Sequence, residues 1–74
     1  MSGVRTVHLR PGEESIRLGQ LLKLVDAVPT GAQAKDVLVA GAVRVNGEPE
    51  ERRGRQVRRG DVVSVEGMPD VRVG

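Results

Sequence analysis

Aliphatic side chains must build the core of this protein, because its sequence contains no aromatic residue and no cysteine. With 74 residues, the chain lies near the lower limit at which a single core can offset the entropy of ordering the backbone. The lone histidine, His8, cannot form a zinc site without several carboxylates. We therefore expect one domain spanning residues 1–74, with a valine-rich core and neither a disulfide nor a metal site.

Two short helices are predicted in the first half of the sequence. Over residues 18–28 the apolar side chains recur at three- and four-residue spacing, which is typical of one helical face. Pro29 is expected to end this helix, because the residue before a proline avoids helical geometry. In the segment TGAQAKDVLVAG, Thr30 and Gln33 have the spacing of a capping box, and Gly41 suits a left-handed cap. A helix-turn-helix-like pair is the result.

Short strands are predicted on both sides of this helix pair. A proline–glycine turn separates an N-terminal strand from an extended segment that enters the first helix. After the helices, AVRVNG alternates in polarity and ends in Asn46-Gly47, the residue pair of a two-residue hairpin. DVVSVEG predicts a strand with Val63 and Val65 on one face, and DVRVG predicts a final edge strand. The expected fold class is α+β, with two helices packed on a small, mainly antiparallel sheet that the N-terminal strand joins.

The sequence offers little that could support catalysis. An active site needs convergent acid, base or nucleophilic groups, and the serines have no histidine partner in a recognisable motif. Three acids, Glu48, Glu50 and Glu51, lie beside arginines, where charge compensation is the simpler explanation. We expect a binding protein rather than an enzyme, without a cofactor. Since the sequence shows no signal peptide and no run of membrane-spanning length, a cytoplasmic location without membrane association is predicted.

Positive charge is concentrated in one segment. The chain has ten arginines and two lysines for a net charge of +2, and half of these cations lie in residues 44–59. Arg52, Arg53 and Arg55 surround Gly54 in a stretch too polar to bury a face, so their guanidinium groups are expected to be free to reach phosphates. This clustering favours a polyanionic partner over a role in solubility alone.

The start of the second helix is another candidate phosphate site. Thr30 and Gly31 expose backbone amides there, and the helix dipole favours an anion at the same place. Lys35 lies one turn further on, and Lys23 can project toward the same side if the two helices pack together. The two lysines alone would favour an ordinary solvated helix surface, and it is the arginine segment that favours binding.

The absence of aromatic residues limits which class of polyanion the protein is expected to bind. Proteins that read single strands rely on aromatic platforms for the bases, and this chain has none. A folded backbone can instead be recognised through its phosphates, its 2′-hydroxyls and the N-termini of helices. Structured RNA is therefore the expected partner, although charge alone does not separate it from DNA.

Several markers occur in a fixed order over residues 16–63. They are the Arg-Leu pair entering the first helix in IRLGQLLKL, then Ala34-Lys35, the run GAVRVNG and the closing Gly60-Asp61. Together they resemble the S4-type RNA-binding domain in its short stand-alone bacterial form. The resemblance implies the S4-type αL fold and RNA binding by the helices and the following hairpin. Ribosomal or transfer RNA, and the ribosome or its precursors, are the implied partners.

The resemblance also implies a set of site residues by position. The cations among them would contact the RNA backbone, and the polar residues would line the start of the second helix. Arg58, next to the turn at Gly60, completes the set. The predicted RNA-binding residues are Lys23, Thr30, Gly31, Gln33, Lys35, Arg52, Arg53, Arg55 and Arg58. Many S4-type domains carry a basic residue where this sequence has Gly31, so one phosphate contact is expected to be missing or replaced by a backbone amide.

Two other classes of protein fit parts of the sequence. A β-grasp sulfur carrier has a similar length and can use VNGE and a late Gly-Asp turn. Such carriers need a C-terminal Gly-Gly, whereas this sequence ends in Val73-Gly74, and two consecutive helices suit a β-grasp poorly. An adapter could instead use the arginines to bind an acidic protein. Salt-sensitive binding to a protein but not to RNA would reveal that alternative.

Overall fold

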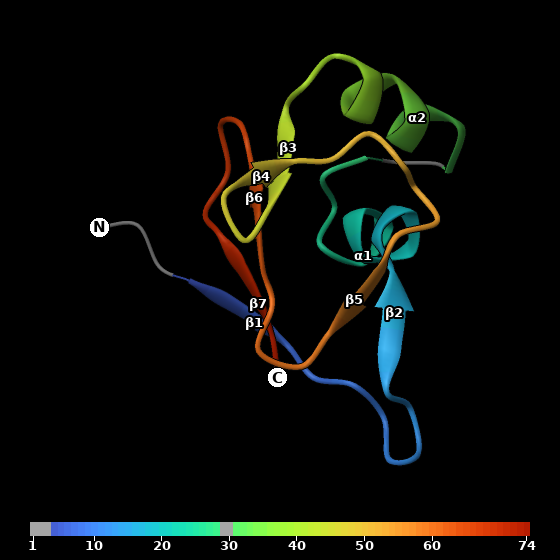
Figure 1. Ribbon diagram of the computed structural model, residues 1–74, viewed down its shortest axis with the longest axis vertical. Coiled ribbons are helices and arrows are strands. Elements are labelled where there is room, and N and C mark those ends of the chain that lie inside the picture. The colour runs from blue at the N-terminus through green and yellow to red at the C-terminus, as the bar shows by residue number, and fades with distance from the viewer. Residues whose placement is uncertain (1–3, 29–30) are drawn as a thin grey trace.

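Two helices lie together on one side of a five-stranded sheet in the computed structural model, which describes residues 4–28 and 31–74 (Figure 1). In chain order, the elements are β1 (Arg5–Val7), β2 (Ser15–Arg17), α1 (Leu18–Leu24), α2 (Gly31–Val39), β3 (Val43–Val45), β4 (Glu48–Pro49), β5 (Gln56–Arg58), β6 (Val62–Val65) and β7 (Val71–Val73). β2 and β5 form a separate two-stranded ribbon next to α1. In the part of the chain that is described, no helix is long and apolar enough to cross a membrane.

The sheet confirms the predicted α+β class but differs from the prediction at one edge. Its strand order is β1-β7-β6-β3-β4, and all pairs are antiparallel except β1–β7. The final strand β7 was predicted at the edge, and that prediction is wrong, because β1 covers its outer side. Val71 and Val73 are almost fully buried, because both side chains face the core. The alternation of polar and apolar residues along a strand predicts which face of the strand is buried, but it does not predict which strands lie beside it.

The core lies between the sheet and the helices and consists of aliphatic side chains. Valines from β3, β6 and β7 pack there with leucines from both helices. The five apolar residues predicted to share one helical face over residues 18–28 are all buried, although Val25 and Val28 lie beyond the end of α1. They are Leu18, Leu21, Leu22, Val25 and Val28.

Helix α1 ends at Leu24, earlier than the predicted end at Val28. Asp26 adopts the left-handed conformation with φ 59°. Its N–H donates to the Lys23 carbonyl at 3.1 Å, and the Ala27 N–H donates to the Leu22 carbonyl at 3.0 Å. These two bonds form the Schellman motif that closes many helices, normally with glycine in the left-handed position. The sequence did not predict this helix end, because the left-handed position is occupied by an aspartate rather than by a glycine.

Helix α2 ends where the sequence predicted. Gly41 has φ 77°, and its N–H donates to the Leu38 carbonyl, while the Ala42 N–H donates to that of Val37. This is a second Schellman motif, here with the usual glycine. The capping box predicted at the other end of α2 involves Thr30, which lies outside the described residues.

Two turns that are distant in sequence hold each other in place. Asn46 and Gly47 form the predicted hairpin turn, with φ values of 52° and 84°. The Asn46 side chain donates to an Asp61 carboxylate oxygen at 3.0 Å and accepts the Val62 N–H at 2.9 Å. Asp61 also accepts the Arg58 N–H at 2.8 Å. These hydrogen bonds, first from Arg58 and then from Asn46, lower the pKa of the Asp61 carboxyl group.

We predict that Gly47→Val destabilises the protein, because a β-branched side chain tolerates the left-handed conformation of Gly47 badly. A penalty of about 1–2 kcal/mol would lower the melting temperature by roughly 5–15 °C in thermal unfolding. Gly54→Val is the matched control, since Gly54 does not have a positive φ and a Cβ there would meet no atom within 4 Å. Equal melting temperatures for the two variants would contradict the assigned turn.

Candidate nucleic-acid interface

A buried carboxylate, that of Glu50, organises the loop between β4 and β5. Glu50 is only 7% exposed, and its Oε2 accepts the backbone N–H groups of Glu51 at 3.1 Å and Arg52 at 3.2 Å. The Arg52 Nε lies 3.2 Å from Oε2, and the Arg55 Nη1 lies 2.9 Å from Oε1. The side-chain hydrogen bonds from Arg52 and Arg55 are the main cause that lowers the pKa of Glu50 to about 2.

These ion pairs correct one expectation about the arginine segment. The guanidinium groups of Arg52 and Arg55 were expected to be free, but both are hydrogen-bonded to Glu50. The Arg52 side chain is still 78% exposed, whereas that of Arg55 is 32% exposed. Charge compensation, which was predicted for the acids of this segment, is confirmed at Glu50.

The backbone of the same loop caps the start of α1. The first amides of a helix have no partner within the helix, and the Arg17 side chain makes no capping hydrogen bond here. Instead, the Leu18 N–H donates to the Arg55 carbonyl at 2.8 Å, and the Gly19 N–H donates to the Arg53 carbonyl at 2.9 Å. A Cβ on Gly19 would lie 3.2 Å from the Arg53 Cβ, so glycine permits this close approach.

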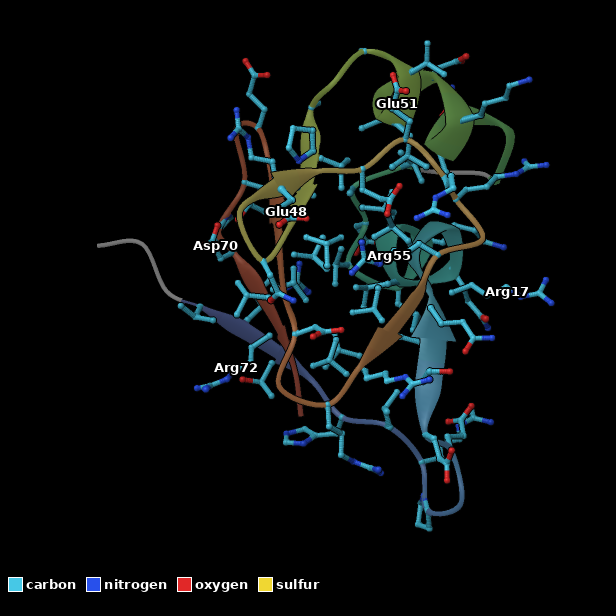
Figure 2. All side chains as sticks on the ribbon, viewed as in Figure 1. Arg17, Glu48, Glu51, Arg55, Asp70 and Arg72 are labelled. Atoms are coloured by element: carbon cyan, nitrogen blue, oxygen red, sulfur yellow. The ribbon has the colours of Figure 1, made fainter. Side chains whose placement is uncertain are left out.

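The docked loop and α1 enclose a surface hollow that we call the cationic hollow. Its volume is about 450 Å³, and its lining residues are Arg17, Gly19, Gln20, Lys23, Arg53 and Gly54. Three of these six residues are basic, none is acidic, and the cations come from β2, α1 and the loop. All three cations are exposed, and Arg17 points away from the body of the molecule (Figure 2). This arrangement can hold an anion such as a phosphate between cations from three elements.

The cationic hollow includes two of the predicted site residues and one that was missed. Lys23 and Arg53 were predicted, and the packing of α1 on α2 that the prediction for Lys23 assumed is present. Arg17 was not predicted as a contact residue. The available signal was its place immediately before the first apolar residue of the helix, which puts it at the helix start next to the arginine segment.

The other predicted site residues do not line the cationic hollow. Lys35 and Gln33 are exposed on α2, and Arg58 is exposed at the end of β5, where its backbone supports the Asp61 turn. Gly31 is the first residue of α2, and Thr30 lies outside the described residues. Within the described ranges, 4–28 and 31–74, no group of three or more His, Cys, Asp or Glu residues could hold a metal ion.

Fold and site together define a small α+β domain with a basic hollow, and the chain belongs to the S4 domain family, whose profile matches residues 8–73. It is 48% identical over 60 residues to the probable ribosome maturation protein RlbA of Bacillus subtilis (strain 168), an alignment that covers 81% of this chain and 84% of that protein. It also resembles the solution structure of YbcJ from E. coli, described as revealing an alfaL motif involved in RNA-binding. The TM-score is 0.67 at 34% identity, over 99% of this chain and 90% of YbcJ. The β-grasp alternative is therefore wrong.

The ion pairs of Glu50 predict a pH-dependent stability. Its pKa is about 2 in the folded protein, below the ordinary 4.5 that we assume for the unfolded chain, so the unfolded state binds the proton more readily. The stabilisation by Glu50 is thus fully present above pH 4.5 and is lost as the pH falls toward 2. We expect Glu50→Gln to be less stable than wild type at pH 7, by about 1–3 kcal/mol in urea unfolding. This difference should shrink steadily below pH 4.5.

Glu51→Gln is the matched control for this prediction. Glu51 is the adjacent, exposed glutamate, and its side chain makes no ion pair with an arginine in the described structure, so the stability of this variant should follow that of wild type closely. A difference between Glu50→Gln and wild type that stays constant from pH 7 to pH 3 would contradict the proposed charge interaction.

Proposed function

We propose that this protein is a non-catalytic RNA-binding protein that holds backbone phosphates of a structured RNA in its cationic hollow. The observation that carries the proposal is the convergence of Arg17, Lys23 and Arg53 on one hollow without an acidic lining residue. Membership of the S4 domain family supports an RNA-binding role. The description of YbcJ and the name of RlbA support RNA, and ribosomal RNA or its precursors in the cytoplasm, as the ligand. Residues 1–74 would act as one domain.

The loop between β4 and β5 supports phosphate binding because its contacts hold Arg53 in position. Glu50 neutralises charge on Arg52 and Arg55, and in doing so it holds the backbone from which Arg53 projects. The carbonyl of Arg53 is anchored on α1, the helix that carries Lys23. A pre-positioned set of cations loses less conformational entropy on binding than flexible side chains would. The paired arginines therefore contribute to the site by fixing its shape.

The ligand is proposed to be a folded RNA because the chain has no aromatic side chain on which an unfolded strand could stack. Contacts to phosphates and 2′-hydroxyls of a shaped backbone are compatible with this composition. Lys35, at the exposed surface of α2, and Arg52, whose side chain is mostly exposed, would extend the contact beyond the cationic hollow. An acidic protein remains the competing partner.

The test is a salt series with a structured ribosomal RNA fragment, measured by fluorescence anisotropy. Replacing both Lys23 and Arg53 by Gln should lower the affinity and reduce the slope of log affinity against log salt by about 1.4, or roughly 0.7 for each lost phosphate contact. The control replaces Arg44 and Arg72 by Gln, which removes the same charge from exposed positions on β3 and β7. Figure 2 shows Arg72 on the opposite side of the molecule from Arg17.

Two outcomes would contradict the proposed function. If both double variants lose the same affinity and slope, and matched duplex DNA and heparin bind as well as RNA, the cations act only as nonspecific charge. If neither variant changes RNA binding but a salt-sensitive complex with an acidic protein forms, the adapter alternative is supported instead.

A further inference from the structure

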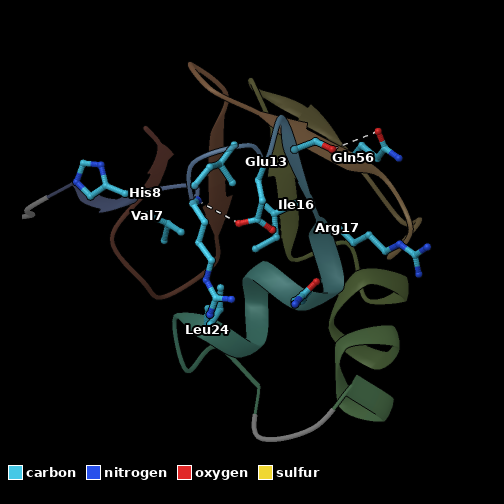
Figure 3. Close-up of a pocket in the computed structure, with 11 residues that line it drawn as sticks. Val7, His8, Glu13, Ile16, Arg17, Leu24 and Gln56 are labelled. Atoms are coloured by element: carbon cyan, nitrogen blue, oxygen red, sulfur yellow. Dashed lines mark hydrogen bonds between the residues drawn. The ribbon is translucent and has the colours of Figure 1, made fainter.

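A second hollow lies next to the cationic hollow and shares two of its lining residues, Arg17 and Gln20. We call it the mixed hollow, since its walls are both apolar and polar. Its volume is about 350 Å³, and its walls come from the end of β1, the segment between β1 and β2, and the elements β2, α1 and β5 (Figure 3). An RNA backbone held at Arg17 would therefore run along the rim of this second hollow.

The apolar part of the mixed hollow suits the face of a flat ring. Leu24, which is 57% exposed, and the half-buried side chains of Val7 and Ile16 surround the space shown in Figure 3. Leu24 is one of few large aliphatic side chains that the described structure leaves exposed. A planar heterocycle packed on these side chains would remove apolar surface from water, which is favourable without an aromatic partner.

The polar part of the mixed hollow presents hydrogen-bonding groups. The Glu13 Oε1 accepts the Arg10 N–H at 3.0 Å, which holds this carboxylate at the wall. Its second oxygen, Oε2, has no partner in the described structure. On the other side, the Gln56 amide is oriented by a hydrogen bond of 3.3 Å from the Ser15 hydroxyl. Gln20 adds a second amide at the boundary with the cationic hollow.

We propose that the mixed hollow receives one unpaired nucleobase, a guanine, from an RNA whose backbone lies on the cationic hollow. This inference rests on the proposed function. Guanine presents two adjacent donors, N1–H and N2–H, on its Watson–Crick edge, and a carboxylate such as that of Glu13 can accept both. Adenine, cytosine and uracil lack this pair of donors. The volume is at the lower end of the range for small-ligand pockets, which suits a single base. Unpaired bases are the usual targets of sequence-specific RNA recognition.

The experiment compares RNA hairpins that have the same stem and carry one bulged G, A, C or U, or no bulge. Wild type is expected to bind the bulged-G hairpin about tenfold more tightly than the fully paired hairpin, the size of one good bidentate base contact. Glu13→Gln should abolish the preference for G while retaining binding to the paired hairpin. Gln keeps an Oε1 for the Arg10 N–H, so the loop should be unchanged.

Removing a negative charge raises the affinity for any RNA. The quantity to compare is therefore the ratio of the affinities for the bulged-G hairpin and the fully paired hairpin. Glu66→Gln makes the same change of charge at an exposed glutamate that does not line the mixed hollow, and it should keep the wild-type ratio. Leu24→Ser should reduce the ratio by removing the apolar contact with the base. Free guanosine monophosphate should compete weakly, because it lacks the flanking phosphates that the cationic hollow would hold.

The possible failures are distinguishable. Equal, salt-sensitive binding to all hairpins would overturn the base-binding inference and leave the proposed function intact. A preference for any bulge that Glu13→Gln does not change would overturn the role of Glu13 and the choice of guanine. Competition by guanosine monophosphate as strong as that of the bulged hairpin would make this a mononucleotide site and overturn the RNA ligand. Absence of binding to every RNA would overturn the proposed function as well.

Discussion

The buried carboxylate of Glu50 is the interaction on which the proposed binding surface depends. A carboxylate that is only 7% exposed must be paired or hydrogen-bonded, and Glu50 satisfies this need with two backbone amides and two arginines. These contacts fold a segment rich in like charges into one defined loop. The carbonyls of that loop then cap the first amides of α1. The position of the helix start and the position of Arg53 therefore follow from the same carboxylate.

The arginines of this segment have different roles, although they look alike in the sequence. The guanidinium group of Arg55 is bound to Glu50, and its carbonyl caps α1. Arg53 lines the cationic hollow together with Lys23 from α1 and Arg17 from the end of β2. The basic character of the hollow thus comes from three separate elements rather than from the arginine cluster. This explains how a chain with a net charge of only +2 can present a localised positive surface.

The cationic hollow and the mixed hollow meet at Arg17 and Gln20, so a single RNA segment can engage both. Phosphate contacts in the first would supply affinity and register, and a base contact in the second would supply selectivity. In a protein without aromatic residues, the apolar contact with a base must come from aliphatic side chains such as Leu24. This division of roles is compatible with the small size of the domain, because α1 and β2 contribute to both hollows.

Most of the secondary structure was predictable because its signals are local. The Asn46-Gly47 turn, the left-handed Gly41 and the buried face of residues 18–28 depend on conformational preferences and periodicity over a few residues. The early end of α1 was missed because an aspartate, Asp26, takes the position where glycine is usual. The order of markers along the chain was also sufficient to indicate the S4 domain family, which the comparisons confirm.

What the linear sequence could not reveal is which residues meet across the fold. The pairing of β7 between β1 and β6, the hydrogen bond of Asn46 to Asp61 and the convergence of Arg17 with Arg53 all join distant segments. The pairing of Arg52 and Arg55 with Glu50 could not be predicted for the same reason. A charged side chain forms an ion pair only where the folded backbone places a partner within reach. Residue identities and spacing thus determined the elements and the kind of partner. The tertiary packing selected the cations that line the proposed site, because ion pairing and burial depend on distances in space rather than along the chain.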